Sequence, residues 1–311
     1  MALSIPWLHK KQAKKGRIGL SAGPDGLGVA YINAEQELVF TKFFANPGDV
    51  EQLLRDLVVE QGWQDMPCSM VLHPVYYQLL LTEAPQVPAN ELCSAVRWKV
   101  KEFLDFPIEE AAIEYFSLPD DAYRGRQKML YVAVLRKSTL QSLVDPVEAS
   151  GLSVDCIEVS ELALHNLFSR LPAERGGSAV VQLCGAEGFI NLVEDGAIYL
   201  CRRIEIGIDG FQHDGDNAKY FEALLLEIQR SMDFYESQLG KGIVSHLYLA
   251  PDNSTTSQIG GFLSSQLGLN VEPLDVADLG MSLEDADSGC IDAIGAAMQP
   301  RKEKEPISAA H

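Results

Sequence analysis

Residues 178–203 read SAVVQLCGAEGFINLVEDGAIYLCRR and contain three runs of β-forming residues separated by two bends. Gly185 lies in the first bend, and Glu-Asp-Gly at 194–196 forms the second. Alternating apolar residues interrupted by such turn residues are typical of antiparallel strands. Some large ATP-binding folds wrap nucleotide phosphates with a strand, a tight turn and a strand, usually with an aspartate at the first bend. Gln182 takes the place of that aspartate here, so the stretch is either a phosphate loop or the remnant of one.

The same pattern of runs and bends occurs near the start of the chain, in residues 17–45. Placing Ser21 over Gln182 aligns the two stretches without gaps and brings Leu38 over Tyr199. Each stretch is followed by a segment with apolar residues at helical spacing. The repetition concerns the pattern rather than residue identity, and it predicts two halves of similar architecture.

The segments after and between the two copies predict a mixture of helices and strands. Helices are predicted at 50–61 and 220–239, at 90–104 with Asn90 as N-cap, and near 284–298. Strands alternating with helices indicate mixed sheets covered by helices, an α/β fold. We expect a basic tail at 1–16, a first lobe at 17–160 with an inserted subdomain at about 86–136, a second lobe at 161–299 and a C-terminal tail at 300–311.

The composition is that of an acidic globular protein. The chain has 311 residues, a length that is enough for two domains. Of these residues 47% are hydrophobic, and the formal net charge is −19. Basic residues without any acid mark the first 17 positions: Lys10, Lys11, Lys14, Lys15 and Arg17. Because the rest of the chain is strongly acidic, no basic face for nucleic acid is expected. The basic N-terminus is either a solvated tail or a contact with an anionic membrane surface.

Neither a membrane-spanning segment nor a signal peptide is expected. The longest apolar runs have the length of a strand, well below the roughly 18 residues of a spanning helix. The six cysteines never form a C-x-x-C pair, which favours reduced core thiols in a cytosolic protein. The histidines lack metal-binding spacing and no catalytic motif occurs, so no metal site or catalytic residue is predicted.

Residues 91–116 read ELCSAVRWKVKEFLDFPIEEAAIEYF, which resembles a pattern of the small inserted subdomain of the PilM family. PilM proteins are actin-like proteins of type IV pilus machines. Residues 149–168 and 224–250 are similar to two further PilM segments, so the resemblance runs from about 17 to 298. It is strongest to the MshI proteins of mannose-sensitive haemagglutinin (MSHA) pili. The resemblance implies a bilobal actin-like, ribonuclease H-like ATPase fold with duplicated strand triplets and a small inserted α/β subdomain.

In nucleotide-binding members of this family, both first bends carry D-x-G, and a Gly-Gly pair follows a late strand. The matching positions of this chain hold other residues: Ser21 and Gly23 in the first copy, Gln182, Cys184 and Gly185 in the second, and Pro251 and Asp252 after the late strand. Mg²⁺ prefers carboxylate oxygens to a hydroxyl or an amide. A side chain at position 184 obstructs the approach of backbone N–H groups to phosphate, and a proline lacks the donor.

The resemblance therefore implies a degenerate nucleotide site, no cofactor and no enzymatic activity, with Mg·ATP disfavoured. The alternative is an ATP-binding switch whose nucleotide state controls partner binding. That protein would have to cradle the phosphates with backbone alone, from Gly23, Gly185 and Gly207.

PilM proteins hold the cytoplasmic N-terminal tail of a PilN-like bitopic inner-membrane protein beside the inserted subdomain. Carried over, the groove involves Arg97, Trp98, Lys101 and Phe106, although Trp98 and Phe106 could instead pack within the subdomain. The resemblance implies a cytoplasmic scaffold, peripheral on the inner-membrane face, that links this partner to the hexameric assembly ATPase. A second alternative is a GspL-like component of type II secretion. GspL proteins normally continue into a membrane helix, and none is seen before His311.

Overall fold

The computed structural model describes residues 16–123, 128–168, 170, 177–211, 217–276, 281 and 287–298. The C-terminal tail at 300–311 and all but the last residue of the N-terminal tail at 1–16 lie outside the described residues. The chain divides into two compact units. One comprises Met1–Tyr76, Ser138–Arg170 and Ser282–His311, and the other comprises Tyr77–Lys137 and Leu171–Met281.

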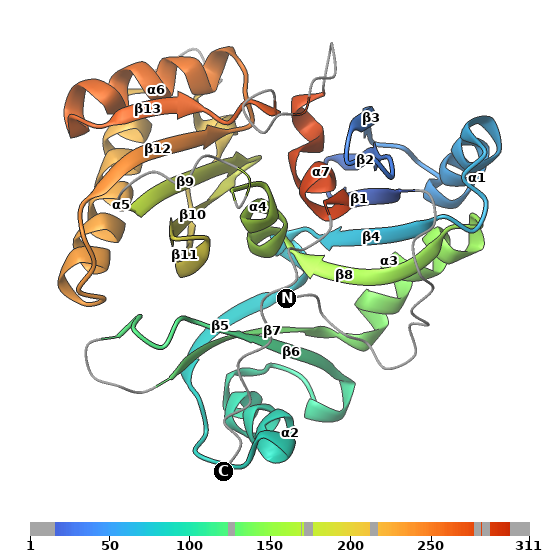
Figure 1. Ribbon diagram of the computed structural model, residues 1–311, viewed down its shortest axis with the longest axis horizontal. Helices are drawn as coiled ribbons and strands as arrows, with labels where there is room; N and C mark the ends of the chain where they lie inside the picture. The colour runs from blue at the N-terminus through green and yellow to red at the C-terminus, as the bar shows by residue number, and fades with distance from the viewer. Residues whose placement is uncertain are drawn as a thin grey trace. The chain divides into compact units, whose positions relative to one another are not determined.

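The first unit is built on a five-stranded sheet with the strand order β3-β2-β1-β4-β8 (Figure 1). Its strands are β1 (Arg17–Gly23), β2 (Gly26–Ile32), β3 (Leu38–Ala45), β4 (Pro67–Leu72) and β8 (Ser153–Val159). The first three pair antiparallel, whereas β4 and β8 run parallel to β1. The accompanying helices are α1 (Val50–Gln61), α3 (Lys137–Ala149), α4 (Ser160–Phe168) and α7 (Ile291–Ala297), with the 3-10 turns η1 (Pro74–Tyr76) and η6 (Ser288–Cys290).

Helix α1 shows how the local sequence fixes both ends of an element. The side chain of Asp49 accepts a hydrogen bond from the backbone N–H of Gln52 at 3.0 Å, which caps the helix. Gly62 ends it in the left-handed conformation, with φ of 69°. The apolar residues at helical spacing include Leu54 and Leu57, which are buried. The helix predicted at 50–61 is confirmed.

The second unit contains a five-stranded sheet of the corresponding order, β11-β10-β9-β12-β13 (Figure 1). Its strands are β9 (Gly177–Cys184), β10 (Glu187–Glu194), β11 (Ala197–Ile204), β12 (Val244–Ala250) and β13 (Asn270–Pro273). The helices α5 (Ala218–Ser237) and α6 (Ser254–Leu267) and the 3-10 turn η4 (Ile208–Phe211) accompany them. Three antiparallel strands followed by two parallel ones repeat the arrangement of the first sheet, so the predicted duplication is confirmed.

The alignment of the two copies holds through their first two strands and then slips by one residue. A register shift follows Tyr31 in β2 and another follows Leu192, the residue aligned with it in β10. Beyond these shifts, Ile32 pairs with Leu38, whereas Val193 pairs with Ile198. The structural counterpart of Leu38 is therefore Ile198, and the prediction of Tyr199 is wrong. The second turn is one residue shorter in the second copy.

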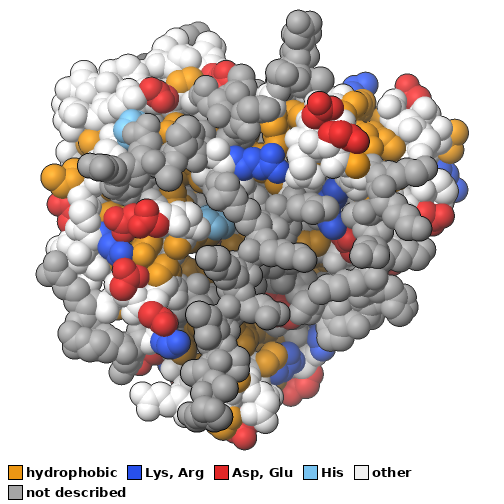
Figure 2. Space-filling view, in the orientation of Figure 1, with side chains coloured by type: hydrophobic (Ala, Val, Ile, Leu, Met, Phe, Trp, Pro, Cys, Tyr) orange, Lys and Arg blue, Asp and Glu red, His pale blue; other side chains and the backbone are white. Residues whose placement is uncertain are grey.

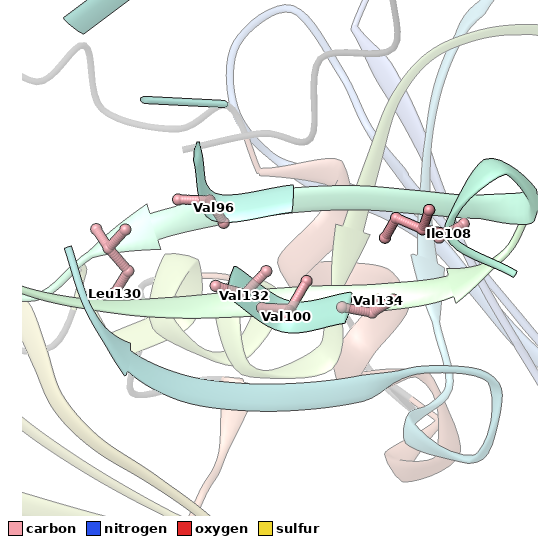
Figure 3. Close-up of a cluster of buried hydrophobic side chains, with 7 residues drawn as sticks. Val96, Val100, Ile108, Leu130, Val132 and Val134 are labelled. Atoms are coloured by element: carbon pink, nitrogen blue, oxygen red, sulfur yellow. The ribbon is translucent and has the colours of Figure 1, made fainter. Parts of the chain in front are cut away.

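The second unit also contains the inserted subdomain, a three-stranded sheet with the order β5-β7-β6. It is formed by β5 (Gln78–Glu83), β6 (Ala111–Ser117), β7 (Met129–Arg136), α2 (Ala89–Val100) and the turns η2 (Lys101–Phe103) and η3 (Ile108–Glu110). Val96 and Val100 of α2 pack on Val132 of β7 and its apolar neighbours (Figure 3). The residue before the helix is Pro88, so the prediction of Asn90 as N-cap is wrong.

Helix α7 belongs to the first unit because residues without large side chains let it approach the sheet and α4 closely. A Cβ atom on Gly19 of β1 would lie 1.8 Å from the carbonyl oxygen of Ala293. A Cβ atom on Gly295 would lie 2.2 Å from the carbonyl oxygen of Ala163 in α4. The compact units therefore differ from the predicted lobes. Helices α4 and α7 fall in the first unit, and the inserted subdomain falls in the second.

Candidate functional site

The first candidate loop follows Ser21 and closes at Gly23. Ser21 pairs with Gly28 of β2 and with Val71 of β4, and a Cβ atom on Gly28 would lie 2.5 Å from the Ser21 hydroxyl oxygen. The Ser21 hydroxyl therefore lies directly over Gly28 of the neighbouring strand β2. A Cβ atom on Gly23 would lie 2.9 Å from Cδ2 of His73. The imidazole ring of His73 is thus packed against the first bend at Gly23.

The second candidate loop contains Gln182, Cys184 and Gly185. Gln182 is buried in β9, where it pairs with β10 and β12, and Cys184 closes the turn. A Cβ atom on Gly207 would lie 2.1 Å from the carbonyl oxygen of Cys184 and 2.2 Å from that of Gly185. The backbone N–H of Asp209 donates to the Gly185 carbonyl at 3.0 Å. Gly207 is needed here for a close approach of two backbone segments, and the bend is packed against the start of η4.

The third candidate loop, at Pro251 and Asp252, leads from β12 into α6. The Ala250–Pro251 peptide bond is cis. The side chain of Asn253 accepts hydrogen bonds from the backbone N–H groups of Thr255 and Thr256, both at 3.0 Å. The Thr256 hydroxyl accepts from the Asn253 N–H at 3.0 Å, which completes a capping box. The N–H groups of Thr255 and Thr256, of the kind that bind anions at helix termini in other proteins, are thus hydrogen-bonded to Asn253.

The four predicted partner-binding residues divide into two pairs, of which Arg97 and Phe106 are internal to the subdomain. The Arg97 guanidinium donates to the carbonyl oxygens of Ile108 and, at 3.3 Å, of Ala111. Phe106 packs against the subdomain core, and the Arg136 guanidinium lies 4.1 Å from its ring centroid. Both side chains hold the segment between α2 and β6 in place.

Trp98 and Lys101 are instead on the surface. The Trp98 side chain is 67% exposed, and the Lys101 ammonium lies 4.9 Å from its ring. Phe103 in η2 is 61% exposed, a residue that the sequence reasoning did not select. The sequence contained no signal for its exposure, because an apolar residue in a predicted amphipathic helix is expected to face the core. We refer to Trp98, Lys101 and Phe103 as the exposed aromatic face.

A buried carboxyl group, which the sequence reasoning also missed, lies in the first unit. Glu158 of β8 is 2% exposed and accepts a hydrogen bond from the Asn166 side chain at 3.0 Å. The same Asn166 amide donates to the carbonyl oxygen of Gly295 in α7 at 3.1 Å. Burial raises the pKa of Glu158 to about 7. The sequence signal was weak, because the strand contains two acids, Asp155 and Glu158, and their spacing does not show which of them has the raised pKa.

The free cysteines are a further set of reactive side chains of the protein. Three free cysteines are buried, Cys68, Cys156 and Cys290, and burial raises the pKa of Cys290 to about 12.

Within the described part of the chain, no cluster of three or more His, Cys, Asp or Glu residues could hold a metal ion. No helix in the described ranges is long and apolar enough to cross a membrane. On the face in Figure 2, the lysine and arginine side chains of described residues form small separate groups among acidic and other side chains.

Comparison with known proteins shows which solved structures share the fold of this chain. No protein-family model and no curated protein matches the sequence. Among solved structures, the chain is similar to a PilM-PilN type IV pilus biogenesis complex, with a TM-score of 0.73 and 17% identity over 92% of this chain and 99% of that chain. A Bacteroides thetaiotaomicron protein with an actin-like ATPase fold and unknown function follows, with a TM-score of 0.52 and 12% identity over 86% and 95% of the two chains.

The ethanolamine utilization protein EutJ from Carboxydothermus hydrogenoformans is similar over 94% of this chain and 92% of its own, with a TM-score of 0.50 and 10% identity. Together with the duplicated sheets, these likenesses define the class: the protein has an actin-like ATPase fold of mixed α/β architecture. The fold predicted from the sequence is confirmed.

Proposed function

We propose that the protein is a non-catalytic scaffold of a type IV pilus assembly platform, of the MSHA type, that binds the cytoplasmic N-terminal tail of a PilN-like inner-membrane protein. The observation that carries the proposal is the fold likeness to a PilM-PilN complex, which spans 92% of this chain and 99% of the other. The sequence resemblance at 91–116 independently points to the same family. The scaffold would act in the cytoplasm, peripheral on the inner-membrane face, and link its partner to the assembly ATPase.

The absence of catalysis in this proposal rests on the three loops. Ser21 and Gln182 supply no carboxylate for Mg²⁺. His73 packs on the first bend and Gly207 on the second, and Asn253 takes up two N–H donors of the third. The alternative of an ATP-binding switch would have to hold the phosphates through backbone groups alone, without a carboxylate at position 21 or 182 for Mg²⁺.

The exposed aromatic face supports a role in peptide recognition. Trp98 and Phe103 are large apolar side chains that remain in solvent although the subdomain has a core of its own. Exposed aromatic residues of this kind serve as anchors in protein interfaces, and ordering of a flexible tail on them gives moderate affinity. Lys101 beside Trp98 would pair with a carboxylate or carbonyl group of the tail.

A calorimetric titration tests this function. A synthetic peptide of the partner's cytoplasmic tail is titrated into the full chain, with a peptide of scrambled order as control. We expect micromolar or tighter binding for the native order and none for the scrambled one. The same titration into Trp98→Ala should show weaker binding. No binding of the native peptide to the wild-type protein would exclude the proposed scaffold role.

A further inference from the structure

The inserted subdomain is joined to the first unit by the chain, but it packs with the second. It follows η1 and precedes α3, two elements of the first unit, at Tyr77 and Lys137. Its contacts with residues 171–281 are therefore entirely non-covalent. The subdomain also has its own core, in which Val96, Val100 and Val132 are buried. A core of its own is the condition for a part of a chain to fold independently of its external contacts.

One contact is made by Tyr131, whose hydroxyl lies against the edge strand β11. The hydroxyl accepts a hydrogen bond from the Cys201 N–H at 2.8 Å and donates to the Cys201 carbonyl oxygen at 3.1 Å. Strand β11 is the outer strand of its sheet, so its outward N–H and C=O groups require partners. The subdomain therefore covers the middle of this edge with one phenol group.

The second contact is a cluster around Lys241. Its ammonium lies 2.6 Å from a carboxylate oxygen of Asp121, which belongs to the subdomain, and 3.0 Å from Glu194 at the end of β10. The Tyr199 hydroxyl lies 3.0 Å from Asp121 and 2.9 Å from Lys241, whose ammonium is 4.0 Å from the Tyr199 ring. The Lys241 ammonium thus pairs with two carboxylates, that of Glu194 in the second sheet and that of Asp121 in the subdomain.

This cluster differs from an ordinary buried ion pair, because moving the subdomain away would leave neither charged group buried without a partner. Breaking a buried pair is costly when it leaves a charge without a counter-ion. Withdrawal of Asp121 leaves Lys241 paired with Glu194, and the Asp121 side chain is already 65% exposed and remains hydrated. Separation of the subdomain from the sheet therefore leaves both charges solvated or paired.

We propose that Asp121 and Lys241 form a latch that holds the inserted subdomain reversibly on the second sheet, and that its opening uncovers the edge of β11 without unfolding either part. The latch belongs to the free protein and goes beyond the scaffold function. It makes the position of the exposed aromatic face adjustable.

Hydrogen exchange of the full chain, followed by mass spectrometry, tests the latch. In Asp121→Ala, we expect exchange at 118–123 and 198–204 to rise by about tenfold or more, as loss of a charge-assisted hydrogen bond predicts. Exchange in β7 and in β9 should stay at the wild-type rate. Asp120→Ala is the matched control, because Asp120 is paired with Lys128 inside the subdomain at 3.1 Å, and it should leave all of these rates unchanged.

Tyr131→Phe provides a second variant, since it removes the hydroxyl from the β11 edge and keeps the ring. It should raise exchange over 198–204 and add to the effect of Asp121→Ala in the double variant. Unchanged exchange in both single variants would overturn the proposal. A uniform rise that includes β7 and β9 would also overturn it, because that result describes a contact for overall stability and not a latch.

Discussion

Ser21 and Gln182 occupy equivalent positions in two sheets of the same strand order. Ser21 pairs with Gly28 of the second strand, and Gln182 pairs with Phe189 of the corresponding strand. Each also pairs with the parallel strand on its other side. The duplication therefore places one hydroxyl and one amide at two equivalent positions of the two sheets. The strand arrangement is the same at both positions, and neither residue has a carboxylate.

The capping box at α6 should contribute to stability. Replacing Asn253 by Ala removes the acceptor for the N–H groups of Thr255 and Thr256. We predict that the free energy of unfolding falls by about 1 kcal/mol in urea denaturation. Asn270→Ala is the control, because Asn270 is exposed in β13 and bonds the Glu272 side chain, and it should change the value by less than ~0.5 kcal/mol. Equal effects of the two substitutions would contradict the role of the cap.

The ion pair of Arg17 and Asp155 should contribute more than any exposed pair in the first unit. The guanidinium contacts both carboxylate oxygens and also donates to Ser69 at 2.7 Å, and the two charged side chains are only 15% and 9% exposed. Asp155→Asn leaves the Arg17 charge largely buried without its counter-ion. We predict a loss of about 3 kcal/mol in the free energy of unfolding, measured by urea denaturation.

The control for this substitution is the exposed helical pair of Glu51 and Arg55 in α1. Glu51→Gln should change the free energy of unfolding by less than ~0.5 kcal/mol, because water and salt screen the pair. If Asp155→Asn were as mild as Glu51→Gln, the buried pair would have no special role in joining β1 to β8.

Glu158 should make stability depend on pH. Its pKa is raised from 4.5 to about 7 by burial, so the folded protein keeps a proton that the unfolded chain releases from about pH 4.5 upward. Stability from this group is therefore present at low pH and is lost as the pH rises to about 7, by about 3 kcal/mol in total. Glu158→Gln stays neutral and retains an oxygen acceptor for Asn166.

The measurement is the difference in unfolding free energy between Glu158→Gln and the wild type from pH 5 to pH 8. We predict that the variant gains on the wild type as the pH rises and that the difference levels off above about pH 7. A difference that does not vary with pH would show that Glu158 has no raised pKa.

Two aromatic residues of the subdomain should behave in opposite ways. Trp98 is 67% exposed, so Trp98→Ala should change stability by less than ~0.5 kcal/mol and weaken binding of the partner peptide by about tenfold or more. Phe106 packs on the subdomain core, so Phe106→Ala should cost about 2 kcal/mol of stability. Thermal unfolding and calorimetry measure the two effects separately. Unchanged peptide affinity in Trp98→Ala would remove Trp98 from the interface.

Much of the fold follows from local patterns. Alternating strands, bends and amphipathic helices predicted the duplicated triplets at 17–45 and 178–203, together with α1 and α5. Tertiary packing decided what the sequence did not reveal. Helix α4 begins at Ser160 directly after β8 ends at Val159, with no glycine or proline to mark the boundary, and β13 is only four residues long.

The candidate site was less predictable than the fold. The changed residues of the three loops could be identified by resemblance, but the contacts that fill the loops depend on distant residues such as His73 and Gly207. Arg97 was carried over from the family resemblance as a groove residue, although its side chain bonds the carbonyl of Ile108, which lies beyond the helix end. Contacts of this kind depend on how the chain turns back after the helix. The spacing of residues within a helix does not predict where that following segment lies.

The most direct test of the central claim, an actin-like fold without its nucleotide chemistry, is a calorimetric titration of the full chain with Mg·ATP, checked by thermal unfolding. A site with a Kd of about 10 μM, tested at about 1 mM ligand, would add ~2.7 kcal/mol of stability and raise the Tm by several degrees. We predict no heat of binding and no change in Tm. A rise in Tm that disappears when Mg²⁺ is omitted would contradict the claim and favour the nucleotide-controlled switch.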